Sequence, residues 1–155
     1  MPKFQLTCRV SASMPYVWKR FTAELLAKLA PPFPIARIIR FDGCQANDQV
    51  IIELDFLVYK TRWTSKITSY QFDSQSHVFV DEGVIVPFGI VAWRHEHRIE
   101  ASGEKNTLVI DKIHFETNNK LLDLLLFPFI WGMIAYRMPL YKKHLRQPKT
   151  LWNLA

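Results

Sequence analysis

The chain has 155 residues and a mass of 18.2 kDa, and 49% of its residues are hydrophobic, 14% aromatic and 22% charged. This composition excludes a disordered or collagen-like chain, and the length predicts one domain over residues 1–155. The net charge of +6 is uneven, because residues 124–155 carry five basic side chains and no acidic one. Cys8 and Cys44 are too few for a disulfide framework, which favours a reducing compartment.

Neither a secretion signal nor a membrane span is expected. Residues 1–6 lack the continuous apolar stretch of a signal peptide, so we expect a cytoplasmic protein. The most apolar segment, 124–136, has no charge but is shorter than the roughly 20 residues that a spanning helix needs. It is typical of a buried helix instead.

The first forty residues predict one strand followed by helix. Apolar and polar side chains alternate over 4–10, the pattern of a strand with one buried face. Apolar residues then recur at spacings of three and four from Trp18 to Leu29, which predicts a helix that is broken in two near Thr22 and ends at Pro31.

The middle of the chain predicts an antiparallel meander. Six apolar or alternating runs are separated by short breaks rich in turn-forming residues. These strands are expected over 35–41, 50–59, 63–72, 77–82, 90–100 and 107–116. The Asp81-Glu82-Gly83 segment could be a turn or a feature of the cavity rim, and a solvated turn is the favoured interpretation.

A long helix is predicted from Asn118 or Asn119 to His144, kinked or interrupted around Pro128 and Pro139. Its apolar side chains leave no clean polar stripe, so it must be enclosed on more than one side or line a cavity. The sequence leaves open whether it is an ordinary core helix or a cavity wall.

Two histidines are predicted to point inward from the strand at 90–100. Residue parity puts His95 and His97 on the same face as Trp93 and Ile99, whereas Arg94, Glu96, Arg98 and Glu100 face solvent. Buried imidazoles need polar partners.

Asp111 is the expected partner, because it lies on the apolar face of the following strand. If Ala101 pairs with Thr107, His97 lies opposite Asp111, and a shift of two residues brings His95 or Ile99 there instead. We therefore predict a cluster of His95, His97 and Asp111.

Three roles remain open for this cluster. It could be a polar network that only satisfies itself, a binding or catalytic site, or part of a metal site. A third metal ligand is not evident and no cysteine cluster supports one, so we expect no metal. The sequence has no nucleophile elbow and no glycine-rich phosphate loop, so we expect no cofactor.

Several motifs together resemble the SRPBCC ligand-binding family, the superfamily of START, polyketide cyclase and birch-pollen-allergen proteins. They are Trp63-Thr64-Ser65-Lys66-Ile67, Phe79-Val80-Asp81-Glu82-Gly83, Pro87-Phe88, the W-x-H-x-H strand from Trp93, and Thr107 with Asp111. The resemblance implies an α+β helix-grip fold. A seven-stranded curved antiparallel sheet would wrap around the long C-terminal helix, with two short helices after strand one and an apolar cavity between sheet and helix.

By the same resemblance, eight inward residues would line or floor the cavity: Trp63, Ile67, Trp93, His95, His97, Asp111, Ile113 and Phe115. Two departures from related sequences concern loops near the expected cavity mouth. Val86 precedes Pro87 where glycine is frequent, and Thr117-Asn118-Asn119 replaces a Pro-Gly-rich segment. Ligand access is expected to differ accordingly.

The leading hypothesis is a binder of an apolar small molecule such as a lipid, a polyketide or an isoprenoid-like compound. The alternative is a cyclase or dehydratase in which Asp111 orients a histidine that acts as general acid or base. The sequence does not decide whether the protein is an enzyme.

A third hypothesis is a weak contact with a membrane surface or a partner through the basic tail, against the simpler interpretation as a solvated helix end. The tail residues are Tyr136, Arg137, Tyr141, Lys142, Lys143, Arg146, Lys149 and Trp152. We expect no nucleic-acid partner, because no basic and aromatic stripe is present. His77, His114 and His144 are interpreted as surface or packing residues, and the oligomeric state is left open.

Overall fold

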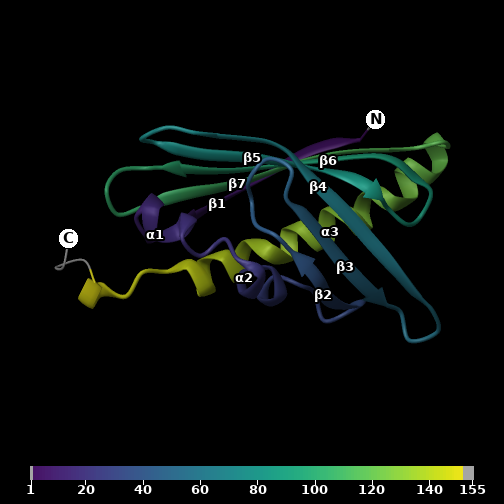
Figure 1. Ribbon diagram of the computed structural model, residues 1–155, viewed down its shortest axis with the longest axis horizontal. Coiled ribbons are helices and arrows are strands. Elements are labelled where there is room, and N and C mark those ends of the chain that lie inside the picture. Colours follow the sequence, from purple (N-terminus) through teal and green to yellow (C-terminus); the bar gives the residue numbers. More distant parts are fainter. Residues whose placement is uncertain (1, 152–155) are drawn as a thin grey trace.

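In the computed structural model, residues 2–151 form a seven-stranded antiparallel sheet crossed by one long helix (Figure 1). The strands are β1 (Lys3–Val10), β2 (Ile35–Phe41), β3 (Gln49–Asp55), β4 (Lys60–Phe72), β5 (Ser76–Ile85), β6 (Ile90–Ala101) and β7 (Thr107–Thr117). The helices are α1 (Met14–Trp18), α2 (Ala23–Lys28), α3 (Lys120–Leu145) and the 3₁₀ helix η1 (Lys149–Leu151). This is the helix-grip architecture that the sequence predicts.

The strand order is β1-β7-β6-β5-β4-β3-β2, so β2 to β7 form a meander and β1 adds to its far edge. Ala101 pairs with Thr107 across the β6–β7 hairpin, which places His97 opposite Asp111 as predicted. Thr107 also donates a hydrogen bond of 2.7 Å to the carbonyl of Ala12, and this bond ties the start of β7 to the segment before α1.

The helical segment after β1 is broken where the sequence predicts it. Pro15 lies in the first turn of α1, where a missing backbone N–H costs no hydrogen bond. Thr22 is extended, with φ −128° and ψ 172°, and separates α1 from the six residues of α2. Leu25 and Leu29 then bury their side chains against the core.

Helix α3 runs for 26 residues and continues through Pro128 and Pro139. The Asn119 side chain caps it by accepting a 2.8 Å hydrogen bond from the backbone N–H of Leu121. Buried Asp123 accepts a 2.7 Å hydrogen bond from the N–H of Thr117 and so fastens the first turn of α3 to the end of β7.

The core has two parts. One joins β1, α1 and α2 to the second half of α3 through residues such as Val10, Val17 and Leu145. The other joins β6 and β7 to the middle of α3 through Phe115 and Ile134.

The prediction that α3 is enclosed on more than one side or lines a cavity is wrong for the first half of its length, because its cavity-lining residues run from Met133 to Tyr141. Ile130 and Ile134 are buried, but Leu121, Leu124 and Leu125 are more than 60% exposed on the opposite side. By length and composition α3 could cross a membrane, and only 17% of its most apolar stretch is buried. The uniform apolarity of this helix therefore reflects an inner face in the core and an outer face that is also apolar.

The β3–β4 turn also differs from the prediction. The apolar residues 56–59 do not extend β3. They form a tight turn in which the Phe56 N–H donates to the Tyr59 carbonyl, at 2.9 Å. Asp55 accepts a hydrogen bond from the N–H of Leu57, whose φ of +70° cannot occur in a strand.

The turn expected at Asp81 is not formed. Strand β5 continues through Asp81 to Ile85. Gly83 serves close packing rather than a turn. A Cβ atom on it would lie 2.7 Å from Val86 and 3.0 Å from the Cβ of Trp93.

The two faces of α3 predict different costs of truncation. Ile134→Ala should lower the free energy of unfolding by about 2–5 kcal/mol, because it leaves a cavity in the core. Leu124→Ala on the outer face should change it by less than about 0.5 kcal/mol. Urea denaturation of both variants measures this, and equal losses would show that the outer face of α3 is covered in solution.

Candidate functional site

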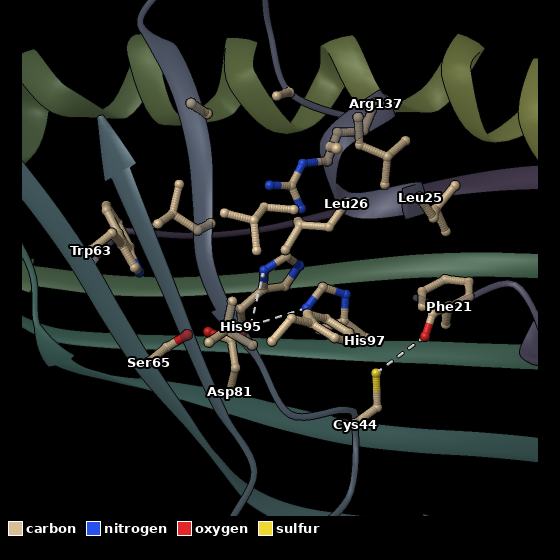
Figure 2. Close-up of a pocket in the computed structure, with 18 of the residues that line it drawn as sticks. Phe21, Leu25, Leu26, Cys44, Trp63, Ser65, Asp81, His95, His97 and Arg137 are labelled. Atoms are coloured by element: carbon tan, nitrogen blue, oxygen red, sulfur yellow. Dashed lines mark hydrogen bonds and ion pairs between the residues drawn. The ribbon is translucent and has the colours of Figure 1, made fainter. Parts of the chain in front are cut away.

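A cavity of about 160 Å³ lies between the inner face of the sheet and the second half of α3 (Figure 2). Its walls are mostly apolar. They come from α2 and the segment after it, from β2 and β3, and from Met133 and Ile134 of α3. Polar side chains are gathered on the floor, formed by β4, β5 and β6, where Ser65, Asp81, His95 and His97 face the cavity.

The polar floor follows from strand register. Asp81 of β5 pairs with His95 of β6, and His97 of β6 pairs with Asp111 of β7. All four residues point to the inner face, because side chains two apart on a strand share a face. Two carboxylates and two imidazoles therefore meet in adjacent rows of the sheet.

Each imidazole lies between the two carboxylates. His95 Nε2 is 3.0 Å from Asp111 Oδ1, and His97 Nε2 is 3.0 Å from Asp81 Oδ2. The remaining nitrogens are close to the other carboxylate. His95 Nδ1 is 3.6 Å from Asp81 Oδ2, and His97 Nδ1 is 3.1 Å from Asp111 Oδ1 without hydrogen-bond alignment.

Aromatic neighbours hold these groups in place. The imidazole rings of His95 and His97 have centroids 3.6 Å apart, and Phe79 stacks on His97 at 4.4 Å. Trp93 donates a 3.1 Å hydrogen bond from its indole N–H to Asp81 Oδ1. These contacts fix the rings and the carboxylate before any ligand binds.

The pKa values of the cluster shift because the groups are buried together. Burial and the neighbouring His97 lower the pKa of His95. Burial opposes protonation of His97, but Asp111 and Asp81 outweigh it and raise the pKa of His97. Burial likewise opposes ionisation of Asp81 and Asp111, yet the two histidines hold both carboxyl pKa values below the ordinary range. The lowered pKa favours the neutral form of His95, which makes this residue the candidate general base. The lowered pKa values of Asp81 and Asp111 favour their ionised forms.

Arg137 and Tyr141 of α3 face the floor from above (Figure 2 shows Arg137). Arg137 Nε is buried and has no hydrogen-bond partner within the described part of the chain. Tyr141 is fully buried, and burial and the nearby Asp111 raise the pKa of its phenol well above the ordinary value.

These two positions correct the prediction that Arg137 and Tyr141 belong to an exposed basic tail. Of that group, Lys142, Lys143, Arg146 and Lys149 are exposed, whereas Trp152 lies outside the described residues. The reason is helical spacing, which puts Ile130, Ile134, Arg137 and Tyr141 on the inner face of α3.

The structure brings together five of the eight residues predicted to line the cavity. Trp63, Ile67, Trp93, His95 and His97 are on its lining, and Trp63 meets Trp93 edge to face at 4.7 Å. The other three are inward but lie outside the lining. Asp111 is fully buried behind the histidines, and Ile113 and Phe115 pack in the core against α3.

The loop differences predicted to alter ligand access are also away from the cavity lining. Val86 packs beside the second core cluster, and residues 117–119 connect the end of β7 to the start of α3. The lining instead includes many of the apolar residues between Phe21 and Cys44, so α2 and the segment after it form the outer wall.

Sequence reasoning missed Ser65, Asp81 and Arg137. Asp81 shares its parity with Phe79, which is a usable signal for an inward carboxylate. Arg137 follows Ile130 and Ile134 at the spacing of one helix face, a signal hidden by the apolar residues all around α3. Ser65 lies between Trp63 and Ile67 and shares their parity, so the same signal applies to it.

His77 is a packing residue, as predicted. It stacks on Trp18 with ring centroids 4.3 Å apart, and its Nδ1 lies 2.8 Å from the Tyr70 hydroxyl. The cavity site therefore contains two of the five histidines.

The arrangement combines groups that can exchange protons with groups that can hold a charge. His95 and His97 offer general acid and base chemistry, and Asp111 and Asp81 orient them. Asp81, His95 and His97 also offer one atom each, within 4.8 Å of one another, that could hold a metal ion.

No protein-family model matches the sequence, and neither does any curated protein. Solved structures do match over nearly the whole chain. The Zhui aromatase/cyclase from Streptomyces sp. R1128 aligns with a TM-score of 0.72 at 16% identity and covers 93% of each chain. A truncated norcoclaurine synthase from Thalictrum flavum aligns with a TM-score of 0.66 at 16% identity, covering 96% of this chain and 95% of that one.

A solution structure of a protein from Arthrobacter aurescens aligns with a TM-score of 0.64 at 15% identity, over 86% of this chain and 80% of that one. The resemblance drawn from the sequence is confirmed at the level of the fold. The chain has the helix-grip fold that these solved structures share.

Removing the carboxylate of Asp111 should destabilise the fold. Asp111→Asn should lower the free energy of unfolding by about 3–5 kcal/mol at pH 7, because it leaves buried imidazoles without their charged partner. Glu96→Gln, on the outer face of β6, should cost less than about 1 kcal/mol, because its ion pairs with Lys112 and Arg98 are near solvent.

The loss of unfolding free energy caused by Asp111→Asn should become smaller as the pH falls. Since the pKa of Asp111 is lower in the folded state, its ionised form stabilises the fold above the unfolded value of about 3.9, and this contribution is lost as the pH falls. Denaturation curves of the unmodified chain and of Asp111→Asn, recorded from about pH 3 to 7, test this. A difference in unfolding free energy that stays constant over this range would contradict it.

Proposed function

We propose that the chain binds a small, mainly apolar molecule carrying an oxygen-containing group in the cavity between the sheet and α3. The observation that carries this proposal is the division of the cavity into apolar walls and a polar floor faced by the unpartnered Arg137 Nε. Pockets of this kind, with a few convergent polar groups, are the usual form of small-molecule sites.

The apolar walls would supply most of the affinity, at about 25 cal/mol per Å² of buried surface before the cost of ordering the ligand. Arg137 and the imidazoles would orient it, since a guanidinium donates readily to carboxylate, enolate or carbonyl oxygen. The fold is shared with an aromatase/cyclase and with a norcoclaurine synthase solved with dopamine and hydroxybenzaldehyde. This kinship supports a small-molecule partner.

The volume of the cavity limits the ligand. About 160 Å³ is close to a cavity that accommodates a single benzene ring. A lipid, polyketide or isoprenoid-like ligand would place one ring or branch over the histidines and extend outward past α2. A small aromatic body is therefore the first class to test.

The second candidate is an enzyme of the cyclase or dehydratase class, and the paired carboxylates favour it. Neutral His95 would remove a proton from a carbon next to a carbonyl. Asp111 would stabilise the imidazolium that forms, and Arg137 would stabilise the enolate oxygen. The substrate loses only a proton in this step, so no external oxidant is needed.

Native mass spectrometry of the protein from its own host, followed by denaturing extraction, tests both candidates. A stoichiometric aromatic or apolar compound is expected, and incubation of fresh compound with the protein separates the two. A binder returns it unchanged, whereas an enzyme converts it. An empty protein over repeated preparations would contradict both.

Filling the cavity should abolish binding without unfolding the protein. Ala36→Phe, on the β2 wall, should weaken the binding of an environment-sensitive apolar fluorophore by at least roughly tenfold, which corresponds to about 1.4 kcal/mol of binding free energy. Ala92→Phe, on the exposed face of β6, is the matched control and should leave the affinity unchanged. Equal affinities for the two variants would place the fluorophore outside the cavity.

We also infer a weak contact between the outer face of α3 and an anionic membrane surface. Exposed Leu121, Leu124 and Leu125 lie on the same side of the helix as exposed Lys142 and Lys143. Apolar residues with cations on one helix face are typical of helices that lie in the membrane interface.

Vesicle co-sedimentation measures this contact. Leu124→Glu together with Leu125→Glu should abolish binding to vesicles that contain phosphatidylglycerol, because charge on the inserted face opposes burial in lipid. Ile39→Glu, at an exposed apolar position on β2, is the control and should bind as the unmodified chain does. Retained binding by the double variant would refute a contact through α3.

A further inference from the structure

Three donor atoms on the cavity floor converge on one point. His95 Nδ1 and His97 Nε2 both face the same oxygen of Asp81, at 3.6 and 3.0 Å, and the three atoms lie within 4.8 Å of one another. They come from β5 and β6, adjacent strands of one sheet, so their spacing is fixed by backbone pairing.

We propose that Asp81, His95 and His97 bind one divalent transition-metal ion at the cavity floor. Two imidazoles and one carboxylate form the donor set that zinc and non-haem iron(II) accept, whereas magnesium and calcium prefer all-oxygen sites. In a tetrahedral site with bonds near 2.0–2.1 Å, neighbouring donors are about 3.3 Å apart. The two nitrogen–oxygen distances to Asp81 lie on either side of this value.

The groups around the three donors match those that surround metal ligands in general. A histidine that binds a metal through one nitrogen usually donates its other N–H to a carboxylate. His95 Nε2 and His97 Nδ1 both lie within 3.1 Å of Asp111 Oδ1. The second oxygen of Asp81 accepts the indole N–H of Trp93, which fixes the plane of that carboxylate.

Charge balance supports the assignment. Four ring nitrogens face carboxylate oxygens, but two neutral imidazoles carry only two N–H groups, so two of these contacts lack a proton. A divalent cation between Asp81 and the two facing nitrogens leaves both N–H groups for Asp111. It also cancels the two buried carboxylate charges, which would otherwise be costly.

The three donors line the cavity, so a bound ion would keep a coordination position open toward a ligand. Sites with three protein ligands and one open position are the form that metals take in catalysis rather than in structure. The oxygen-containing group of a cavity ligand is the donor that such a position accepts. Cobalt(II), zinc(II) and iron(II) are therefore the ions to test.

The experiment uses the full chain after treatment with a chelator and dialysis. Titration with cobalt(II), followed by its visible absorption, and equilibrium dialysis with zinc(II) and with iron(II) under exclusion of air should each show one equivalent bound. Magnesium should not bind. Asp81→Asn, which keeps the side-chain shape, should abolish this binding, as should His95→Ala. His144→Ala removes a histidine at the far end of α3 and should bind as the unmodified chain does.

A second variant tests the proposal without removing any of the three donors. Asp111→Asn leaves all three donors in place and should weaken binding by about 10–100-fold, the effect typical of losing the carboxylate behind ligating histidines. Circular dichroism confirms that each variant is folded.

Two outcomes would overturn the proposal. One is no stoichiometric binding of cobalt, zinc or iron(II). The other is binding that survives in folded Asp81→Asn, which would show that the ion is held away from these three donors. Neither depends on the cavity ligand, because Ala36→Phe should retain the metal while losing the apolar fluorophore.

Discussion

The pairing of β5, β6 and β7 in one register is the constraint on which the candidate site depends. A slip of one residue between β6 and β7 would turn Trp93 and Ile99 toward solvent, so the buried apolar residues fix the register. The same register then forces His95 and His97 inward, between Asp81 and Asp111. The polar cluster is thus placed by the hydrophobic effect acting on its neighbours.

Two carboxylates cannot be buried side by side unless positive charge or hydrogen-bond donors accompany them. In this chain the compensation comes almost entirely from two imidazoles, with one indole N–H on Asp81. Arg137, the nearest guanidinium on the cavity lining, forms no ion pair with either carboxylate among the described contacts. Its charge is therefore not neutralised by a carboxylate of the floor, and its side chain contacts Tyr141 on the cavity lining.

Much of this fold could be predicted from sequence because period and turn chemistry are local. Alternation around Trp93 identified the inward histidines, and hairpin parity identified Asp111 as their partner. Asp81 was misjudged because glycine two residues later suggested a turn, whereas Gly83 is required by its approach to Trp93. The outer face of α3 was misjudged because composition cannot distinguish a helix buried all round from one that presents apolar residues to the surroundings.

The separation of apolar walls from polar floor makes affinity and orientation depend on different elements. The walls belong largely to α2, β2 and β3, at one edge of the sheet, and α2 has only six residues with Leu25 as its one fully buried side chain. The floor lies on β4, β5 and β6, each flanked by strands on both sides. A short helix with little buried surface opens at lower free energy than paired central strands. The wall can therefore adapt to the shape of a ligand while the histidines and carboxylates keep the geometry that orients it.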